Sequence, residues 1–256
     1  MATGLLPELS LPHSMLTDWV SRGMSAAIRA LFKQAGRLEA RVRAEPITKL
    51  LQGRIDSFEL VGQNLQMYNG LQLSLLELFC SAVAIDFSQI WQGQIKLRQP
   101  VQARMRVVLS EVDLAQSFNT PLVLNKLAQV EGKNQPLSFC QVEVRLTPEQ
   151  RLQLRAKAQQ GEGRVFQVGF SARLEVIERR CLCLADPLFE GETEEGRALS
   201  RALVDHLNAL LDLDRLALRG SKLQVDRVCL QPHQMILYGS AILARFPTRR
   251  SHSENA

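Results

Sequence analysis

The stretch from residue 71 to residue 114 constrains the fold of this chain more than any other. In its second half, apolar residues alternate with mostly polar ones, which predicts a strand with one buried face and one wet face. The apolar positions are Val101, Ala103, Met105, Val107 and Leu109. The first half, residues 73–87, is apolar at nearly every position. Such a strand needs cover on both faces, and three kinds of cover remain open: helices, a second sheet, or a bound apolar ligand.

Composition excludes some classes of protein and leaves others open. The chain has 256 residues, 46% of them hydrophobic, which suits one large domain or two small ones. A net charge of +5 is compatible with an anionic membrane surface as partner, and equally with an ordinary basic protein. Dense Lys/Arg runs with interleaved aromatics are missing, so nucleic-acid binding is not expected.

The five cysteines are scattered through apolar segments, which is typical of small core residues in a reducing compartment. No apolar run reaches the roughly 18 residues that a membrane span needs. The first residues also lack the basic start and long apolar core of a secretory signal. We therefore expect a cytoplasmic protein, peripheral at most on the inner face of a membrane.

Residues 14–33 have the three- and four-residue spacing of an amphipathic helix whose polar side is mostly basic. Two interpretations stay open: the helix packs on the sheet, or it lies on a membrane surface. The second would make the following residues membrane contacts: Trp19, Arg22, Met24, Ile28 and Arg29.

The remaining chain reads as strands and short helices. We expect hairpin corners at residues 62–64 and at Asn69-Gly70, a capped helix after Ser110, a short helix at 121–129, and a long leucine-striped helix at 195–211. Eight or nine strands, many of them long and framed by two amphipathic helices, with few βαβ signals, predict an α+β fold with a mainly antiparallel sheet. The expected division is a lead and helix at 1–36, one β-rich domain at 37–247, and a disordered tail at 248–256.

No constellation of residues indicates catalysis. Nucleophile-elbow, phosphate-loop and dinucleotide motifs are missing, and the four histidines are isolated. Cys181 and Cys183 share one face of a strand but have no second ligand pair at metal-binding spacing. We therefore expect a protein that is not an enzyme and has no metal or cofactor, with an unrecognised hydrolase or metal enzyme as the least favoured alternative.

Four segments resemble a known family of bacterial proteins, the LmeA-like phospholipid-binding proteins. They are LLQGRIDSFELVGQNLQM (50–67), AIDFSQIWQGQIKLRQPVQARMRVVLSEVDLAQSF (84–118), LDLDRLALRGSKLQVDRVCL (211–230) and YGSAILARFP (238–247). The resemblance implies a fold similar to the tubular lipid-binding (TULIP-like) folds, in which a long, curved, mainly antiparallel sheet is wrapped around amphipathic helices and encloses acyl chains. Because the matching residues are structural, it implies no catalytic residues.

Together these observations predict non-enzymatic binding of phospholipid acyl chains in an apolar tube, with transfer or sensing at a membrane surface. The inner faces of strands and the striped helix would line the tube. The expected lining residues are Met105, Val107, Phe166, Val168, Phe170, Leu199, Leu203 and Leu207. The alternative is a structural or protein-interaction module whose apolar faces are filled by its own helices. The sequence specifies neither the lipid nor the oligomeric state.

Overall fold

The computed structural model describes residues 13–86, 96–128, 137–160, 164–191, 193–213 and 221–244. The helices of these residues are α1 (His13–Arg29), α2 (Thr48–Leu51), α3 (Glu111–Phe118), α4 (Pro121–Leu127) and α5 (Glu194–Leu210). The strands are β1 (Phe32–Arg43), β2 (Arg54–Met67), β3 (Gln72–Asp86), β4 (Lys96–Leu97), β5 (Val101–Ser110), β6 (Leu137–Leu146), β7 (Leu152–Gln160), β8 (Arg164–Ile177), β9 (Cys181–Glu190), β10 (Ser221–Gln231) and β11 (Gln234–Leu243).

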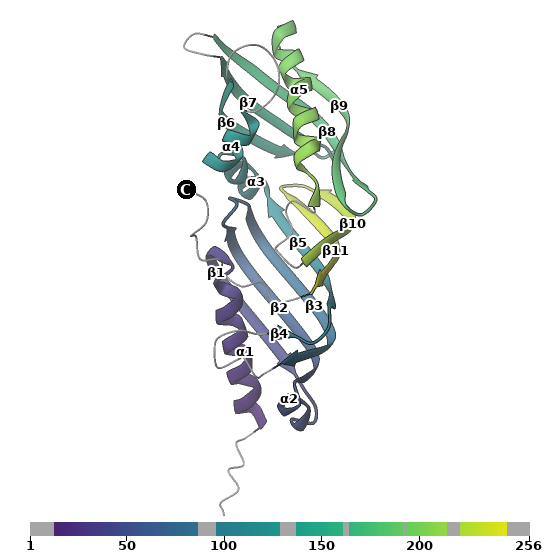
Figure 1. Cartoon of the computed structure of the whole chain (residues 1–256). Helices are drawn as coiled ribbons and strands as arrows, with labels where there is room; N and C mark the ends of the chain where they lie inside the picture. Colours follow the sequence, from purple (N-terminus) through teal and green to yellow (C-terminus); the bar gives the residue numbers. More distant parts are fainter. Residues whose placement is uncertain are drawn as a thin grey trace, which may run out of the picture.

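These strands form two open antiparallel sheets. The first has seven strands in the order β1-β2-β3-β5-β11-β10, with β4 paired to β3, and the second has the order β6-β7-β8-β9. Figure 1 shows an elongated molecule with α1 beside the first sheet and α5 against the second. The expected α+β, mainly antiparallel class is confirmed, but the strands are divided between two sheets instead of lying in one.

The N-terminal helix ends earlier than its apolar pattern predicts. It ends at Arg29, and the chain pairs as β1 from Phe32 onward. Residues 37–44 lie almost wholly in this strand, with Leu38, Ala40 and Val42 packed into the core. Their strict alternation of charged and apolar residues is the period-two pattern of a strand with one buried face.

Helix α1 covers the free edge of β1. The hydroxyl of Ser25 accepts a hydrogen bond from the Ala40 amide at 2.9 Å, and the hydroxyl of Ser21 accepts one from the Val42 amide at 3.2 Å. An edge strand otherwise presents unpaired amides that invite another strand. The helix therefore satisfies backbone groups of β1 as well as packing on it.

The other sheet is protected at its edges in the same way. On β6, the Asn119 side chain at the end of α3 accepts from the Val142 amide at 3.1 Å and donates to the Val142 carbonyl at 2.7 Å. On β9, the Asn208 side chain of α5 accepts from the Leu184 amide at 2.8 Å. Helix side chains thus hold both edges of the second sheet.

Two of the predicted local signals are confirmed and one is wrong. Asn69-Gly70 forms the turn between β2 and β3, with Gly70 at φ +91°. Ser110 caps α3 as half of a reciprocal capping box. The corner predicted at residues 62–64 does not exist, because β2 runs through it and Gly62 lies directly against the Leu65 side chain.

The core continues from the first sheet into the second. Hydrogen bonds link the first sheet to elements that pack on or belong to the second: the Gln72 amide of β3 donates to the Ser117 hydroxyl of α3 at 2.9 Å, and the Val225 amide of β10 donates to the Arg179 carbonyl in the β8–β9 turn at 2.9 Å. Gly239 lets β10 bend close to β11, since an added Cβ there would lie 1.9 Å from the Gln224 carbonyl oxygen. The apolar inner faces of both sheets therefore form one buried cluster.

Candidate lipid-binding site

An apolar cavity of about 60 Å³ lies where the two sheets meet. Its walls come from α3, α5, β7, β8, β9 and the start of β11. Every lining residue is hydrophobic: Leu114, Phe118, Leu152, Leu154, Phe170, Leu174, Leu182, Leu184, Leu207, Leu211 and Met235. Such a cavity offers no hydrogen-bond partner, so it suits hydrocarbon and not a polar molecule.

Helix α5 supplies one wall of this region. Thr193 caps the helix, its hydroxyl accepting from the Gly196 amide at 3.1 Å. Leucines spaced four residues apart then fall on one face and pack on β8 and β9: Leu199 is 9% exposed, Leu203 0% and Leu207 4%. The sequence stripe is therefore the buried face of a helix, as its spacing predicts.

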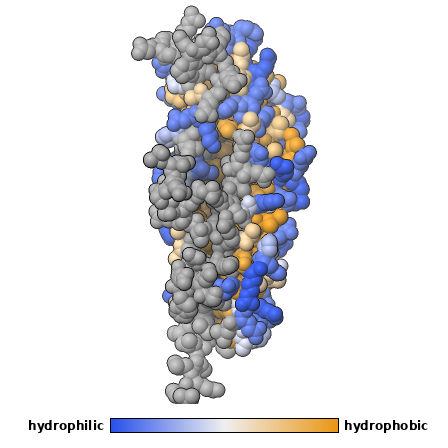
Figure 2. All heavy atoms as spheres, in the orientation of Figure 1, coloured by the Kyte–Doolittle hydropathy of each residue, from blue (hydrophilic) through white to orange (hydrophobic). Residues whose placement is uncertain are grey.

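The inner face of the first sheet extends the apolar surface beyond the cavity. Met105 faces Leu78 on β3 and Gly239 on β11, while Val107 faces Leu76 and Leu237. Several of these side chains are only half-buried, among them Leu76, Leu78, Met105, Leu223 and Val228. Figure 2 shows hydrophobic residues that reach the visible surface beside polar ones.

The predicted lining residues lie in both sheets and on α5. Phe170 and Leu207 line the cavity, and Val168, Leu199 and Leu203 are buried in the same core. Phe166 is half-buried against that core, and Met105 and Val107 lie on β5 of the first sheet. The structure thus brings most of them to one end and leaves the β5 pair on the other sheet.

Other cavity residues were missed by the sequence analysis. Strict alternation in residues 152–158 and 166–176 is the signal that would have identified Leu152, Leu154 and Leu174. Leu114, Phe118 and Met235 have no such signal, because only the meeting of α3 and β11 with the second sheet brings them to the cavity.

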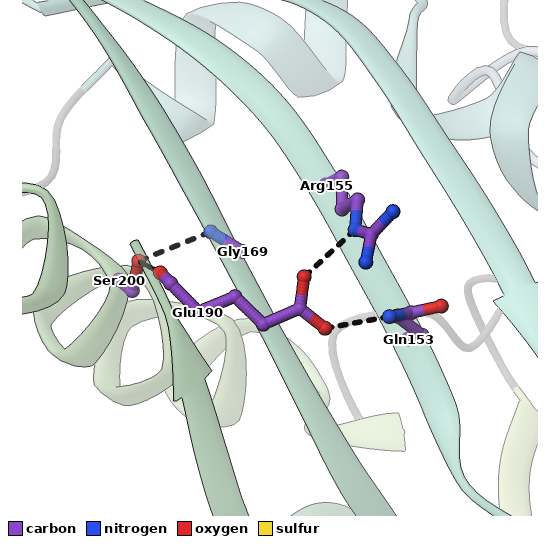
Figure 3. A network of polar contacts seen from close by, with 5 residues as sticks. All are labelled: Gln153, Arg155, Gly169, Glu190 and Ser200. Atoms are coloured by element: carbon purple, nitrogen blue, oxygen red, sulfur yellow. Dashed lines mark hydrogen bonds and ion pairs between the residues drawn. The ribbon is translucent and has the colours of Figure 1, made fainter. Parts of the chain in front are cut away.

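The outer face of the second sheet carries a polar network (Figure 3). The Glu190 carboxylate accepts from Arg155 Nε at 2.7 Å and from Gln153 Nε2 at 2.5 Å. Gly169 lies between Arg155 and Glu190 in the register, and an added Cβ would come within 3.4 Å of the carboxylate. The buried Ser200 hydroxyl accepts from the Gly169 amide at 3.1 Å, which ties α5 to the same strand.

Electrostatics in this network are those of a structural ion pair. Burial by itself raises the pKa of Glu190, but the hydrogen bonds from Arg155 and Gln153 outweigh burial, so the net effect lowers that pKa below its ordinary value. The adjoining hollow of about 470 Å³ has charges of both signs in its lining. It therefore does not fit an acyl chain.

The predicted membrane contacts of α1 are divided between buried and exposed positions. Met24 and Ile28 are 1% and 6% exposed and pack against the sheet. Arg29 Nη2 donates to the Ala35 carbonyl at 2.7 Å, and Arg22 is exposed. The side chain of Trp19 lies outside the described residues. In this conformation Met24 and Ile28 serve packing, which favours the sheet-packing interpretation of the helix.

Chemistry-bearing side chains are dispersed over the described part of the chain. There, no three His, Cys, Asp or Glu side chains gather as a metal site would require, and Cys80, Cys140, Cys181, Cys183 and Cys229 are free thiols. Burial raises the pKa of Cys80 to about 11. Across the same residues, none of the helices combines the length and apolarity of a membrane span.

Comparison with known proteins agrees with the apolar character of this region. The family model described as LmeA-like phospholipid-binding matches residues 13–240, a range that includes both sheets, α1 and α5. No curated protein and no solved structure matches the chain. Since the match covers most of the sequence, this chain belongs to the LmeA-like phospholipid-binding family.

Proposed function

We propose that this protein binds phospholipid without catalysing a reaction on it, and holds the acyl chains along its apolar interior. The observation that carries the proposal is the entirely hydrophobic cavity that adjoins the half-buried inner face of the first sheet. A polar or charged ligand would find no partner there, whereas an acyl chain gains about 0.8 kcal/mol for each CH₂ group it buries. A 16-carbon chain would gain about 12 kcal/mol before the costs of binding.

The interior must widen to accept a chain. Pockets that hold small molecules usually measure about 300–1,000 Å³, whereas this cavity measures about 60 Å³. In the proposal the chain enters the cavity and continues along Met105 and Val107, so that the two open sheets act as a tubular lipid-binding fold. Transfer or sensing of the lipid would take place at a membrane surface. In this proposal the protein is peripheral on the inner, cytoplasmic face of the membrane.

Mass spectrometry of organic extracts from gently purified protein tests the proposal. Stoichiometric phospholipid, missing from a matched control protein, is the expected result. A protein that is empty and also takes up no lipid from liposomes would refute it.

A pair of variants places the lipid. Phe170 and Leu203 are 0% exposed, so a charged side chain at either position would unfold the protein. Loss of lipid in such a variant would therefore not report on the binding site. Leu174 lines the cavity but is half-buried, and Leu188 lies on the same sheet with 63% of its surface exposed. Leu174→Asp is expected to lose the lipid while folded, and Leu188→Asp to keep it; equal retention in both would remove the cavity from the site.

The small cavity volume favours one alternative, a protein-interaction or structural module whose second sheet is filled by α5. That function predicts that the interior stays packed and takes up no lipid when the protein is incubated with liposomes, and that the protein binds a protein partner. Retention of phospholipid through purification, lost in Leu174→Asp, distinguishes lipid binding from this alternative.

A further inference from the structure

In the first sheet, the neighbouring strands β3 and β5 are paired over only part of their length and then separate. The two strands pair from Leu75 with Val108 to Phe79 with Arg104, and no further pair follows along the described residues. Beyond this point β3 turns away at Ala82, which has φ +53°, and then pairs with β4. A hollow of about 550 Å³ lies in the split.

Residues of both sheet faces line this hollow. Outward-facing Phe79, Ser81, Gln102 and Arg104 form its rim, and Cys80 and Val101, which are 4% and 6% exposed, belong to the apolar core. Since the strands have parted, their facing backbone groups have no partner in the β3–β5 ladder. The hollow therefore joins hydrogen-bonding groups at the surface to core residues below.

Arg104 supplies a positive charge at the rim. Its guanidinium carbon stands 4.8 Å from the centre of the Phe79 ring, and no ion pair of Arg104 with a carboxylate is found in the described part of the chain. Its neighbour Arg106 is different, because Arg106 Nη1 pairs with Glu77 at 3.0 Å. A guanidinium held over a ring and facing a hollow is a suitable partner for a phosphate oxygen.

The sheet face around the hollow carries further positive charge. In the register, three rows of outward-facing residues cross the sheet at and beside the hollow. Their cations outnumber their carboxylates: Arg41, Arg43, Arg104, Arg106, Lys222 and Arg227 against Glu39, Glu59 and Glu77. Such an excess attracts anions to this face.

We propose that the hollow between β3 and β5 is a headgroup site that binds the phosphate of a phospholipid through Arg104. This inference rests on the proposed function and adds a polar subsite to it, on the first sheet and separate from the cavity under α5. The shared chemistry is a phosphate ester, which a lipid headgroup or a small soluble phosphate would both offer.

Three soluble probes separate these sources: dihexanoyl phosphatidylglycerol, dihexanoylglycerol with the same tails and no phosphate, and glycerol 3-phosphate. Binding to the full-length protein is measured by calorimetry. The wild type is expected to bind the phosphatidyl probe about tenfold or more tightly than dihexanoylglycerol, the usual size of a charge-assisted hydrogen bond.

Two variants test the hollow itself. Arg104→Gln removes the charge and Ser81→Trp fills the space, and both positions are exposed, so the fold is expected to survive, as checked by circular dichroism. Each should abolish the preference for the phosphatidyl probe and leave dihexanoylglycerol binding unchanged. Arg37→Gln, which is exposed on the same face of β1 but lies outside the hollow and outside the three rows around it, is the matched control and should keep the preference.

Each contrary result has a separate meaning. A wild type that binds both diacyl probes equally, or an Arg104→Gln variant that keeps the preference, overturns the headgroup site and leaves acyl binding standing. Glycerol 3-phosphate that binds as tightly as the phosphatidyl probe, in an Arg104-dependent way, assigns the hollow to a soluble phosphate ester and overturns the lipid assignment. Failure of both diacyl probes to bind overturns the proposed function itself.

Discussion

Removing the two serine hydroxyls of α1 tests whether this helix is an edge cover of the first sheet. Ser21→Ala and Ser25→Ala together leave the amides of Ala40 and Val42 without their acceptors. Both of these residues are only 6% exposed. A buried donor without a partner costs about 1–3 kcal/mol, and alanine returns about 0.5 kcal/mol of helix propensity at each position. The double variant should therefore lose about 1–5 kcal/mol of unfolding free energy.

Urea denaturation measures this loss, and hydrogen exchange locates it. The amides of Ala40 and Val42 should exchange about tenfold faster or more in the double variant, since each 1.4 kcal/mol of lost protection is a factor of ten. Ser138→Ala is the control, because Ser138 is exposed on β6 and its single side-chain hydrogen bond within the described residues is long, at 3.4 Å; it should stay within about 0.5 kcal/mol of wild type. Unchanged stability and unchanged exchange in the double variant would refute the edge-cover role.

Three further predictions concern packing, pH and thiol reactivity. Gly239→Ala should lower the free energy of unfolding by about 3 kcal/mol or more, because its Cβ would overlap the neighbouring strand. Gly23→Ala, whose Cβ meets nothing within 4 Å, should raise the free energy of unfolding by about 1 kcal/mol. Equal melting temperatures of the two variants would contradict the close approach of β10 and β11. Burial raises the pKa of Glu111, but hydrogen bonds from the β10–β11 turn and the end of β6 outweigh it and lower that pKa overall. The stability that the carboxylate contributes is therefore present above its ordinary pKa of about 4.3 and lost as the pH falls through the lowered value. Glu111→Gln should flatten the acid limb of the pH–stability curve. An unaltered acid limb would exclude a contribution of the Glu111 carboxylate to stability. Iodoacetamide should modify exposed Cys140 well before Cys80, whose burial raises its pKa to about 11, as peptide mass spectrometry would show; equal rates would mean that the core around Cys80 opens freely.

Local signals predicted much of the fold because they act over a few residues. The turn at Asn69-Gly70 requires a positive φ that glycine supplies, and the Ser110 cap satisfies a backbone amide three residues away. The leucine stripe of α5 follows from helical geometry alone. Each of these features was correct because no distant part of the chain opposes it.

Local pattern failed where a distant partner decides. Residues 62–64 have the composition of a turn, but β2 continues through them because it pairs with β1 and β3 along its length. The helical pattern of residues 14–33 extends past Arg29 in sequence, yet Phe32 and its successors gain more by joining the sheet, where alternate side chains enter the core. Tertiary pairing overrides propensity at both places.

The sequence by itself determined which faces of the strands and of α5 are apolar, since a side-chain period of two or of 3.6 residues is written in the order of residues. It also determined that the buried faces are mostly aliphatic, because aromatic residues make up only 5% of the chain. Only the tertiary structure decided that the strands divide into two sheets, that helix side chains cover the edges of β1, β6 and β9, and that β3 and β5 part to leave a hollow beside Arg104. These features join residues far apart in the chain, and their free energy comes from contacts that no short stretch of sequence contains.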